Sequence, residues 1–249
     1  MAQIHPNEHT KSLVRVRGMS KAYGQVTALR DVEFSIRSGE LLGLIGPNGA
    51  GKTTLFECLA GVQAADTGEF MLEPGNTKRI RRSSVLFYVP DGIAPWPDQP
   101  VNWALEFCLG FFGGRRDLYQ DVVRDLSLSG LLQSRVGALS KGQRKRVLLA
   151  MGLLMPQPIL LIDEPFEGLD LRQSRDVEAI LQMQVSLGRT LFVSIHQIAD
   201  AARVCDRFVL LSNGSVAAEG TLDELTALAA GRTGSPPPSD FEEVFLALT

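Results

Sequence analysis

The sequence predicts an α/β fold with a mixed, mostly parallel sheet, an N-terminal antiparallel β ribbon and an inserted helical subdomain. Short β-rich runs alternate with longer helical runs from Leu13 onward, which is typical of a parallel sheet whose strands are connected by helices. Some of these runs, such as residues 41–45, are apolar almost throughout, as strands covered on both faces are. A helical pattern from about 101 to 155 separates two strand signals and indicates the insertion.

Composition limits the classes of protein to which the chain can belong. With 249 residues, 45% of them hydrophobic, it can bury a core without disulfides. The formal net charge of −3 does not attract phosphate backbones, so no nucleic-acid partner is expected. Cys58, Cys108 and Cys205 lie far apart, which favours buried thiols in a reducing compartment. No apolar run reaches the about 20 residues of a bilayer span, and we expect a cytoplasmic chain.

The first part of the predicted sheet comes from residues 13–61. Apolar and polar side chains alternate at 32–36, as expected for a strand with one wet face in an antiparallel ribbon. The apolar run 41–45 predicts a buried strand. A helix is expected from 51 to about 60, with Gly61 in position to end it.

The middle of the chain predicts the inserted subdomain. A strand is expected at 85–89, and the following loop, 90–100, holds four prolines. The section from 101 to 155 has helical character, and its last helix, 143–155, ends at Pro156 before a strand at 159–162. We therefore place the helical subdomain at about 91–155.

The last part of the chain adds one helix, two further strand regions and a tail. A helix is predicted at 171–187 and a strand at 190–195, and the pair Asn213-Gly214 predicts a two-residue hairpin. Capping boxes are expected at Thr221 with Glu224 and at Ser239 with Glu242. The final helix has one apolar stripe, which favours docking on its own domain. The predicted organisation is an N-terminal extension at 1–12, a main domain at 13–230, a linker at 231–239 and a C-terminal helix at 240–249.

Residues 46–53, with the sequence GPNGAGKT, match the phosphate-binding pattern G-x-x-x-x-G-K-[ST] between an apolar strand and a helix. The glycines let backbone N–H groups turn toward an anion, and Lys52 supplies charge for the β- and γ-phosphates. Thr53 offers a hydroxyl to Mg²⁺. A glycine-rich turn that binds nothing would not explain Lys52 and Thr53 at this register. The core is therefore predicted to be a P-loop NTPase, whose nucleotide-binding residues are Gly46, Pro47, Asn48, Gly49, Ala50, Gly51, Lys52, Thr53 and Thr54.

Two carboxylates, Asp163 and Glu164, follow the apolar strand 159–162, as in the second essential motif of a P-loop nucleotidase. Asp163 is the candidate for holding Mg²⁺ through its water. Glu164 suits a general base that orients the attacking water. Acidic residues at a strand end also cap helices, so this pair by itself leaves both interpretations open.

Between these motifs stands the pentapeptide 139–143, LSKGQ, and with it the chain resembles the nucleotide-binding domains of ABC transporters over roughly residues 13–224. The pentapeptide is similar to the family signature LSGGQ. The resemblance implies that Ser140, Lys141, Gly142 and Gln143 act on an ATP held by a second subunit, with Ser140 and Gly142 at its γ-phosphate. From these five residues alone, Ser140 is better explained as a helix N-cap.

Other positions match the family in order. Tyr23 corresponds to the aromatic residue that stacks on adenine. Asp170, in the segment 168–170, corresponds to the D-loop. His196 corresponds to the switch histidine, which contacts the γ-phosphate and holds the water geometry with Glu164.

One position departs from the family pattern. Asp91 stands where the family has a glutamine. An ionised carboxylate can approach Mg²⁺, but it cannot donate a hydrogen bond and it adds negative charge beside three phosphates. The usual magnesium contact and the coupling to a membrane partner are therefore in question at Asp91.

The resemblance implies an ATPase subunit that uses ATP and Mg²⁺, pairs with a second cassette around two ATP molecules, and powers separately encoded transmembrane permease subunits at the cytoplasmic face of the membrane. The tail at 240–249 resembles the C-terminal helix of exporter-type ATPases, so export is favoured over import. The alternatives are an importer subunit, a non-transport ABC ATPase, or a regulatory module that binds nucleotide without hydrolysing it. Asp91 is the sole indication of the regulatory module.

Overall fold

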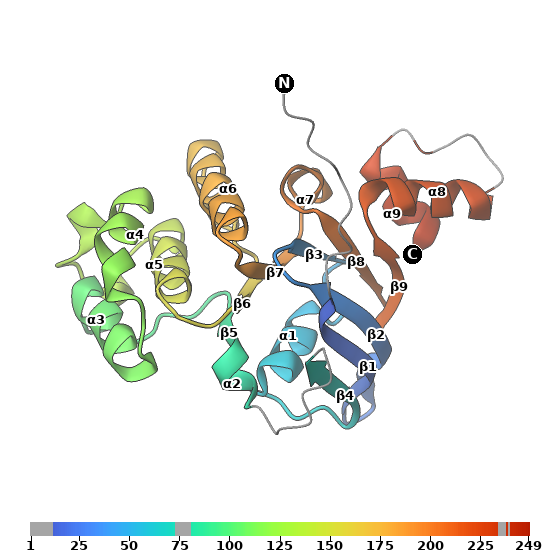
Figure 1. Cartoon of the computed structure of the whole chain (residues 1–249), viewed down its shortest axis with the longest axis horizontal. Helices are drawn as coiled ribbons and strands as arrows, with labels where there is room; N and C mark the ends of the chain where they lie inside the picture. The colour runs from blue at the N-terminus through green and yellow to red at the C-terminus, as the bar shows by residue number, and fades with distance from the viewer. Residues whose placement is uncertain (1–11, 73–80, 234–237, 239) are drawn as a thin grey trace.

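The computed structural model describes residues 12–72, 81–233, 238 and 240–249. The predicted N-terminal extension lies outside these residues, apart from Ser12. Positions 234–237 and 239 of the predicted linker also lie outside them. Figure 1 shows a group of helices, α3 to α5, at one side of a central sheet and the helices α8 and α9 at the other side.

The central sheet confirms the prediction of a mixed, mostly parallel sheet. Its strand order is β5-β6-β7-β3-β8-β9, in which only the β8–β9 pair is antiparallel. The strands β3, β6 and β7 are buried along their whole length, which explains their nearly continuous apolar sequences. The six strands are β3 (Leu41–Ile45), β5 (Leu86–Val89), β6 (Ile159–Asp163), β7 (Thr190–Ile195), β8 (Arg207–Ser212) and β9 (Ser215–Gly220).

A second, antiparallel sheet of three strands confirms the N-terminal ribbon and extends it. Its order is β2-β1-β4, with β1 at Ser12–Tyr23, β2 at Val26–Arg37 and β4 at Thr67–Leu72. The strand β4 has no buried residue, so its sequence lacks the apolar alternation that predicts a half-buried strand. Pairing with β1 makes it a strand.

Helix α1 (Lys52–Ala60) lies between the two sheets. Its Phe56 ring lies 4.9 Å from that of Phe192 on β7, and the Phe192 ring lies 5.4 Å from that of Phe34 on β2. Gly61 ends the helix in the left-handed conformation, with φ of 75°, as its sequence position predicted. One aromatic cluster thus joins both sheets to the helix that follows the phosphate loop.

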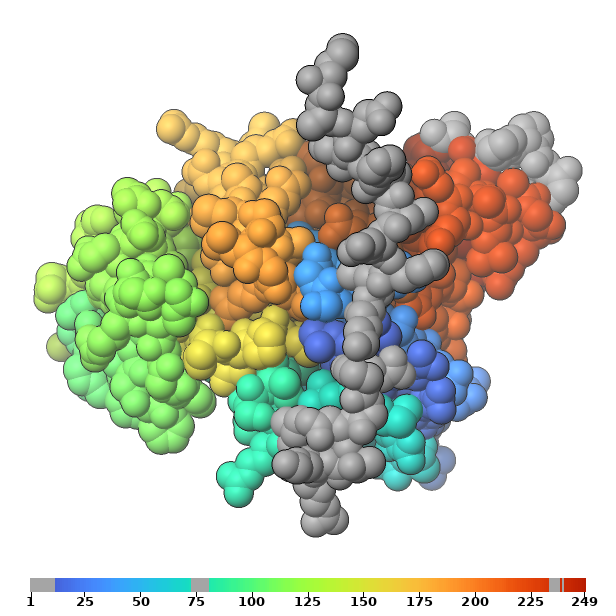
Figure 2. Space-filling model, in the orientation of Figure 1, coloured from blue at the N-terminus to red at the C-terminus, as the bar shows by residue number. Residues whose placement is uncertain are grey.

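The inserted helices form a lobe at one side of the sheet (Figure 2). They are α3 (Val101–Phe112), α4 (Tyr119–Asp125) and α5 (Lys141–Leu153), and they lie between β5 and β6 in the chain. Several predicted boundaries in this part of the chain differ from the structure, among them the end of α5, which lies at Leu153 and not at 155. Residues 82–85 form the short helix α2 (Arg82–Val85), so β5 is shorter than expected. Helix α5 begins two residues earlier than expected because Ser140 and Gln143 form a capping box.

The C-terminal part adds α6 (Leu171–Ser186), α7 (Ile198–Val204), α8 (Leu222–Thr233) and α9 (Phe241–Leu248). The sequence did not predict α7. The apolar stripe of α9 docks on its own domain, where the rings of Phe241 and Phe208 lie 4.5 Å apart. Asn213 and Gly214 both have positive φ, as the predicted hairpin turn requires. Within the described ranges, no helix is long and apolar enough to span a bilayer.

Of the two capping boxes predicted near the C-terminus, the structure contains the first. Thr221 and Glu224 form the predicted capping box, since each backbone N–H donates to the side chain of the other residue. The second predicted box, at Ser239 with Glu242, is not what caps α9. Asp240 caps α9 by accepting from the N–H of Glu243, and Ser239 lies outside the described residues. Helix α8 also continues to Thr233, into the segment expected to be a linker.

Candidate active site

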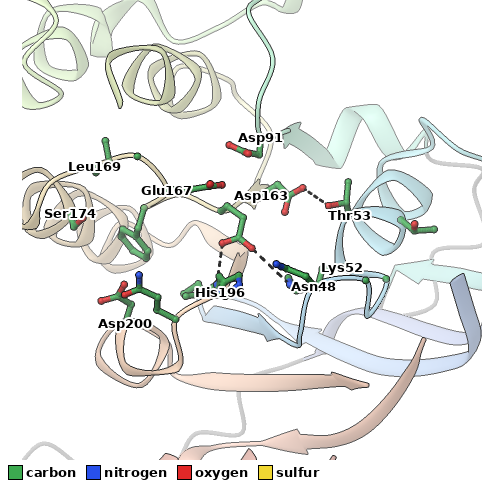
Figure 3. A pocket seen from close by; sticks show the side chains of 18 of the residues that line it. Asn48, Lys52, Thr53, Asp91, Asp163, Glu167, Leu169, Ser174, His196 and Asp200 are labelled. Carbon is green, nitrogen blue, oxygen red and sulfur yellow. Dashed lines mark hydrogen bonds and ion pairs between the residues drawn. The ribbon is translucent and has the colours of Figure 1, made fainter. Parts of the chain in front are cut away.

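One cavity, at the carboxyl ends of the parallel strands β3, β6 and β7, gathers most of the predicted residues (Figure 3). Its volume is about 910 Å³. Carboxyl ends of parallel strands meet at one edge of a sheet, which brings residues far apart in sequence together. The predicted residues that line it are Asn48, Gly49, Gly51, Lys52, Thr53, Thr54, Asp91, Asp163, Glu164 and His196.

The phosphate loop connects β3 to α1 by a path that only glycine allows at two positions. A Cβ on Gly46 would lie 2.3 Å from the carbonyl oxygen of Leu211. Gly51 has φ of 106°, and a Cβ there would lie 2.5 Å from the carbonyl oxygen of Ala28. No side chain caps the first N–H groups of α1, which leaves a helix N-terminus suited to an anion.

Lys52 is buried at the start of α1 and reaches back over the loop. Its ammonium donates to the carbonyl oxygen of Gly46 at 2.8 Å and lies 4.0 Å from the Glu164 carboxylate. The lysine is thus held between the loop and a carboxylate, where it can meet a polyphosphate.

Asp163, at the end of β6, accepts hydrogen bonds from three hydroxyl groups. Thr53 donates to it at 2.9 Å, Ser194 at 2.5 Å and Tyr88 at 3.4 Å. Burial raises the pKa of Tyr88 further above its usual value, and the Asp163 charge adds to this, so the phenol stays a donor. Thr53 and Asp163 were each predicted from the sequence as candidates for Mg²⁺. Ser194 and Tyr88, which reach Asp163 from the neighbouring strands β7 and β5, were not predicted.

The donors at this position fit Mg²⁺. Among the residues that the structure describes, no group of three or more His, Cys, Asp or Glu side chains could hold a metal by itself. Mg²⁺ is commonly bound through one or two protein oxygens, waters and the phosphates of a nucleotide. A hydroxyl and a carboxylate oxygen, 2.9 Å apart beside a phosphate loop, match that donor set.

Glu164 has an unusual backbone and a perturbed carboxylate. Its φ of 50° is in the left-handed region, which costs free energy for a residue other than glycine. Its N–H donates to the Ser194 hydroxyl, and its carboxylate accepts from the backbone N–H of His196 at 3.1 Å. Burial raises the pKa of Glu164 above its usual value, although the Lys52 charge opposes the shift. Such constraints gather at catalytic sites.

Asp91 lines the cavity and forms an ion pair that its sequence position does not predict. Its partner is Lys145 of α5, whose side chain is 2% exposed. The Lys145 ammonium also donates to the main-chain oxygen of Asp163 at 3.1 Å. Burial favours the neutral form of Asp91, but the hydrogen bond and charge of Lys145 hold its pKa below the usual value. The only signal in the sequence was a lysine on the same helix face as Leu148, Leu149 and Gly152.

The residues of the signature pentapeptide do not line this cavity. Ser140 accepts from the N–H of Gln143 at 3.2 Å and so caps α5, as its N-cap interpretation predicted. Gly142 abuts the segment 168–170, because a Cβ there would lie 2.5 Å from the carbonyl oxygen of Gly168. Asp170 caps α6 by accepting from the N–H of Gln173 at 2.8 Å. Lys141 forms an exposed ion pair with Glu167.

Tyr23 and His196, which the resemblance assigns to adenine and to the γ-phosphate, lie in different surroundings. The Tyr23 ring is 44% exposed at the end of β1, outside the lining of the cavity, although Val26 to Ala28 after it do line the cavity. His196 lines the cavity, and its backbone N–H donates to the Glu164 carboxylate.

Comparison with known proteins agrees with this geometry. A family model described as ABC transporter matches residues 29–167. The chain is 29% identical to the SkfA peptide export ATP-binding protein SkfE of Bacillus subtilis, over 82% of this chain and 87% of that protein. It is 30% identical to the aliphatic sulfonates import ATP-binding protein SsuB of Pectobacterium atrosepticum, over 82% of this chain and 76% of that protein.

The fold is also that of a solved structure described as an ATP binding subunit of an ABC transporter. The two share 28% identity with a TM-score of 0.83, over 95% of this chain and 99% of the other. The family model covers more than half of the chain. The relative named as an import protein is 30% identical over 82% of the chain. The chain therefore belongs to the ABC transporter family, as one of its ATP-binding cassette ATPases.

Proposed function

We propose that the chain is the ATP-hydrolysing subunit of an ABC exporter, working at the cytoplasmic face of a membrane as one of a pair of cassettes. One observation carries the hydrolytic part of this proposal. Glu164 is held in a strained backbone 4.0 Å from Lys52, and Thr53 and Asp163 are joined beside it in the same cavity. A charge for phosphates, a donor pair for Mg²⁺ and a base for water are thus assembled in one place.

The roles follow from these positions. The amides of residues 46–54 and the ammonium of Lys52 bind the phosphates of ATP. Thr53 and Asp163 would hold Mg²⁺, which would neutralise negative charge on the phosphates of ATP. Glu164 orients the attacking water and accepts its proton. His196 contacts the γ-phosphate, and its N–H keeps the Glu164 carboxylate in place.

A second copy or a related cassette completes the site in this proposal. Ser140, Lys141, Gly142 and Gln143 lie at the start of α5, outside the cavity of their own chain. A hydroxyl and a helix N-terminus suit an anion, so we assign these residues to the γ-phosphate of the ATP on the partner. Asp170 joins the two sites through the segment that abuts Gly142. Tyr23, exposed at the end of β1, stacks on adenine.

The permease partner is supported by a row of exposed aromatic rings on α3. Trp103, Phe107 and Phe111 are spaced one helical turn apart. The Trp103 and Phe107 rings stack with centroids 5.1 Å apart, and those of Phe107 and Phe111 with centroids 5.8 Å apart. Exposed apolar patches of this kind mark protein or membrane contacts. We assign this row, the aromatic face, to the permease subunit.

The direction of transport rests on the C-terminal helix. The relatives include named export and import proteins, so their names support either direction. The segment of α9 resembles the tail of exporter-type ATPases, which favours export. Transport assays in vesicles of known orientation, with the co-purified permease, decide between the two, and ATP-driven uptake toward the cassette side would contradict export.

The hydrolytic assignment is tested with two variants. Glu164→Gln should bind ATP, lower turnover by about a hundredfold or more and accumulate an ATP-bound dimer, since it keeps the shape of the base but not its proton affinity. Lys52→Ala should lose nucleotide affinity. Equilibrium titration with ATP, phosphate release and size-exclusion chromatography measure these effects. Normal turnover in Glu164→Gln would reject the base, and unchanged ATP affinity in Lys52→Ala would reject the phosphate site.

A further inference from the structure

The nucleotide cavity is lined by more negative side chains than an anion site would be expected to hold. Its lining includes the carboxylates of Asp91, Asp163, Glu164, Glu167 and Asp200. Lys52 is the one lysine or arginine in that lining among the described residues. Like charges beside a polyphosphate weaken its binding, so some of this negative charge must be compensated from behind the cavity wall.

Three of the five carboxylates have a cation outside the lining. Glu167 pairs with Lys141, and Asp200 pairs with Arg203 at 3.0 Å. Asp91 pairs with Lys145. The first two pairs are partly or largely exposed, so water and salt screen them and their contribution is small. The Asp91 pair differs because its cation is almost completely buried.

Lys145 joins three elements at one ammonium group. It extends from α5, in the helical lobe, to the Asp91 carboxylate on the loop that leaves β5 and to the main-chain oxygen of Asp163 at the end of β6. A buried ammonium needs such partners, because an unpaired one would be costly. Its position therefore depends on Asp91, and the position and charge of Asp91 depend on Lys145.

We infer that Lys145 is a positioning and charge-compensating residue of the nucleotide site, which allows a carboxylate at position 91 without repelling the phosphates of ATP. The inference rests on the proposed binding of ATP in this cavity. Lys145 does not touch the nucleotide in this arrangement, since it is absent from the lining of the cavity. It acts through Asp91 and through the end of β6.

The test measures ATP affinity in EDTA, where no metal masks the effect of charge. Lys145→Met leaves Asp91 uncompensated and should weaken ATP binding about tenfold, a change of about 1.4 kcal/mol. Asp91→Asn with Lys145→Met removes both charges and should return the affinity to within about twofold of the parent chain. Arg144→Met is the matched control, because it removes the same charge from the preceding residue of α5, which lines no part of the cavity.

The outcomes separate compensation of charge from a structural role. If the double variant binds ATP as weakly as Lys145→Met does, the lysine only supports the fold and the inference is wrong. If Arg144→Met loses as much ATP affinity as Lys145→Met, the effect comes from the net charge of the chain alone, and the inference is wrong. Raising the salt concentration should weaken ATP binding less in Lys145→Met than in the parent. The reason is that salt also screens the repulsion between the unpaired Asp91 carboxylate and the phosphates. Failure of the parent chain itself to bind ATP would reject the proposed function instead.

A folding defect is detected separately. Circular dichroism and thermal unfolding should show that the double variant folds, since replacing both partners of a buried pair by neutral groups is tolerated far better than removing one. Should Lys145→Met be too unstable to titrate, Asp91→Asn alone provides the measurement. It keeps the cation and removes the carboxylate, so it should bind ATP in EDTA at least as tightly as the parent, and weaker binding would contradict the inference.

Discussion

At the scale of single residues, Glu164 combines two unfavourable features. Its backbone is in the left-handed region and its carboxylate is mostly buried, which raises its pKa. Contacts with Ser194 and His196 hold it there. A buried, ionised carboxylate costs stability that the rest of the fold must offset, as expected at a proposed catalytic residue where activity and stability compete.

Glu164→Gln should therefore be more stable than the parent chain at neutral pH. Because the folded-state pKa of Glu164 lies above the ordinary value of 4.5, the folded state holds the proton more tightly than the unfolded state. The stability due to that proton is present below pH 4.5 and is lost as pH rises through the folded-state pKa. Thermal unfolding between pH 4 and 7.5 should show the advantage of the variant near neutrality and its disappearance in acid.

The same shift predicts the acidic side of the activity profile. Glu164, the proposed base, is mainly ionised only above its raised pKa, so kcat/KM of the parent should fall with decreasing pH before pH 4.5 is reached. A profile that stays flat down to pH 4.5 would contradict a raised pKa at the base.

At the scale of elements, α3 has two faces with different partners. Residues such as Ala104, Leu105 and Cys108 are buried in the lobe, while Trp103, Phe107 and Phe111 form the aromatic face. Trp96 extends this face from the loop that begins near Asp91, with its ring 4.9 Å from that of Phe107. The proposed permease contact and the nucleotide cavity thus share one loop.

Phe107→Asp should separate hydrolysis from partner binding. The variant places a charge in the middle of the aromatic face, where burial by a partner would leave it desolvated. We expect unchanged ATPase activity of the isolated chain and a loss of about tenfold or more in permease co-purification. Leu187→Asp, at the exposed end of α6, is the control and should change neither quantity. Equal recovery of permease with both variants would reject the aromatic face as its contact.

At the scale of the whole molecule, the proposed catalytic groups are divided between two surfaces. The cavity lies at one edge of the central sheet, whereas the signature residues lie at the start of α5 and contact the segment 168–170. A symmetric pair of chains would give each cavity the signature residues of the other chain, which is the isologous arrangement of a twofold dimer.

Mixing two inactive variants tests this division. Lys52→Ala keeps the signature residues, and Ser140→Asp keeps the phosphate loop, while its carboxylate also preserves the cap of α5. In an equimolar mixture, mixed dimers have one intact site, so about a quarter of the parent ATPase activity should return if chains pair at random and sites act independently. A mixture no more active than its components would contradict a site shared between chains.

The sequence predicted best where the conformation is a local property. The apolar runs of β3, β6 and β7, the glycine stop at Gly61 and the Asn213-Gly214 turn all appear where expected, because burial pattern and backbone freedom are encoded in the residues themselves. The strand β4 and the helices α2 and α7 were missed. They are short, and in β4 and α2 no residue is buried, so contacts with other segments decide their conformation.

By itself, the sequence determined the order of the buried strands of the central sheet and the phosphate loop, since Gly51 must adopt a positive φ and Lys52 must follow it at the start of a helix. The tertiary structure alone decided which groups surround the carboxylates. Ser194 lies 31 positions from Asp163, and Lys145 lies 54 positions from Asp91. These pairs form only when β6, β7 and α5 pack together. Lys145 thereby becomes a buried partner of Asp91, because burial makes an ion pair necessary.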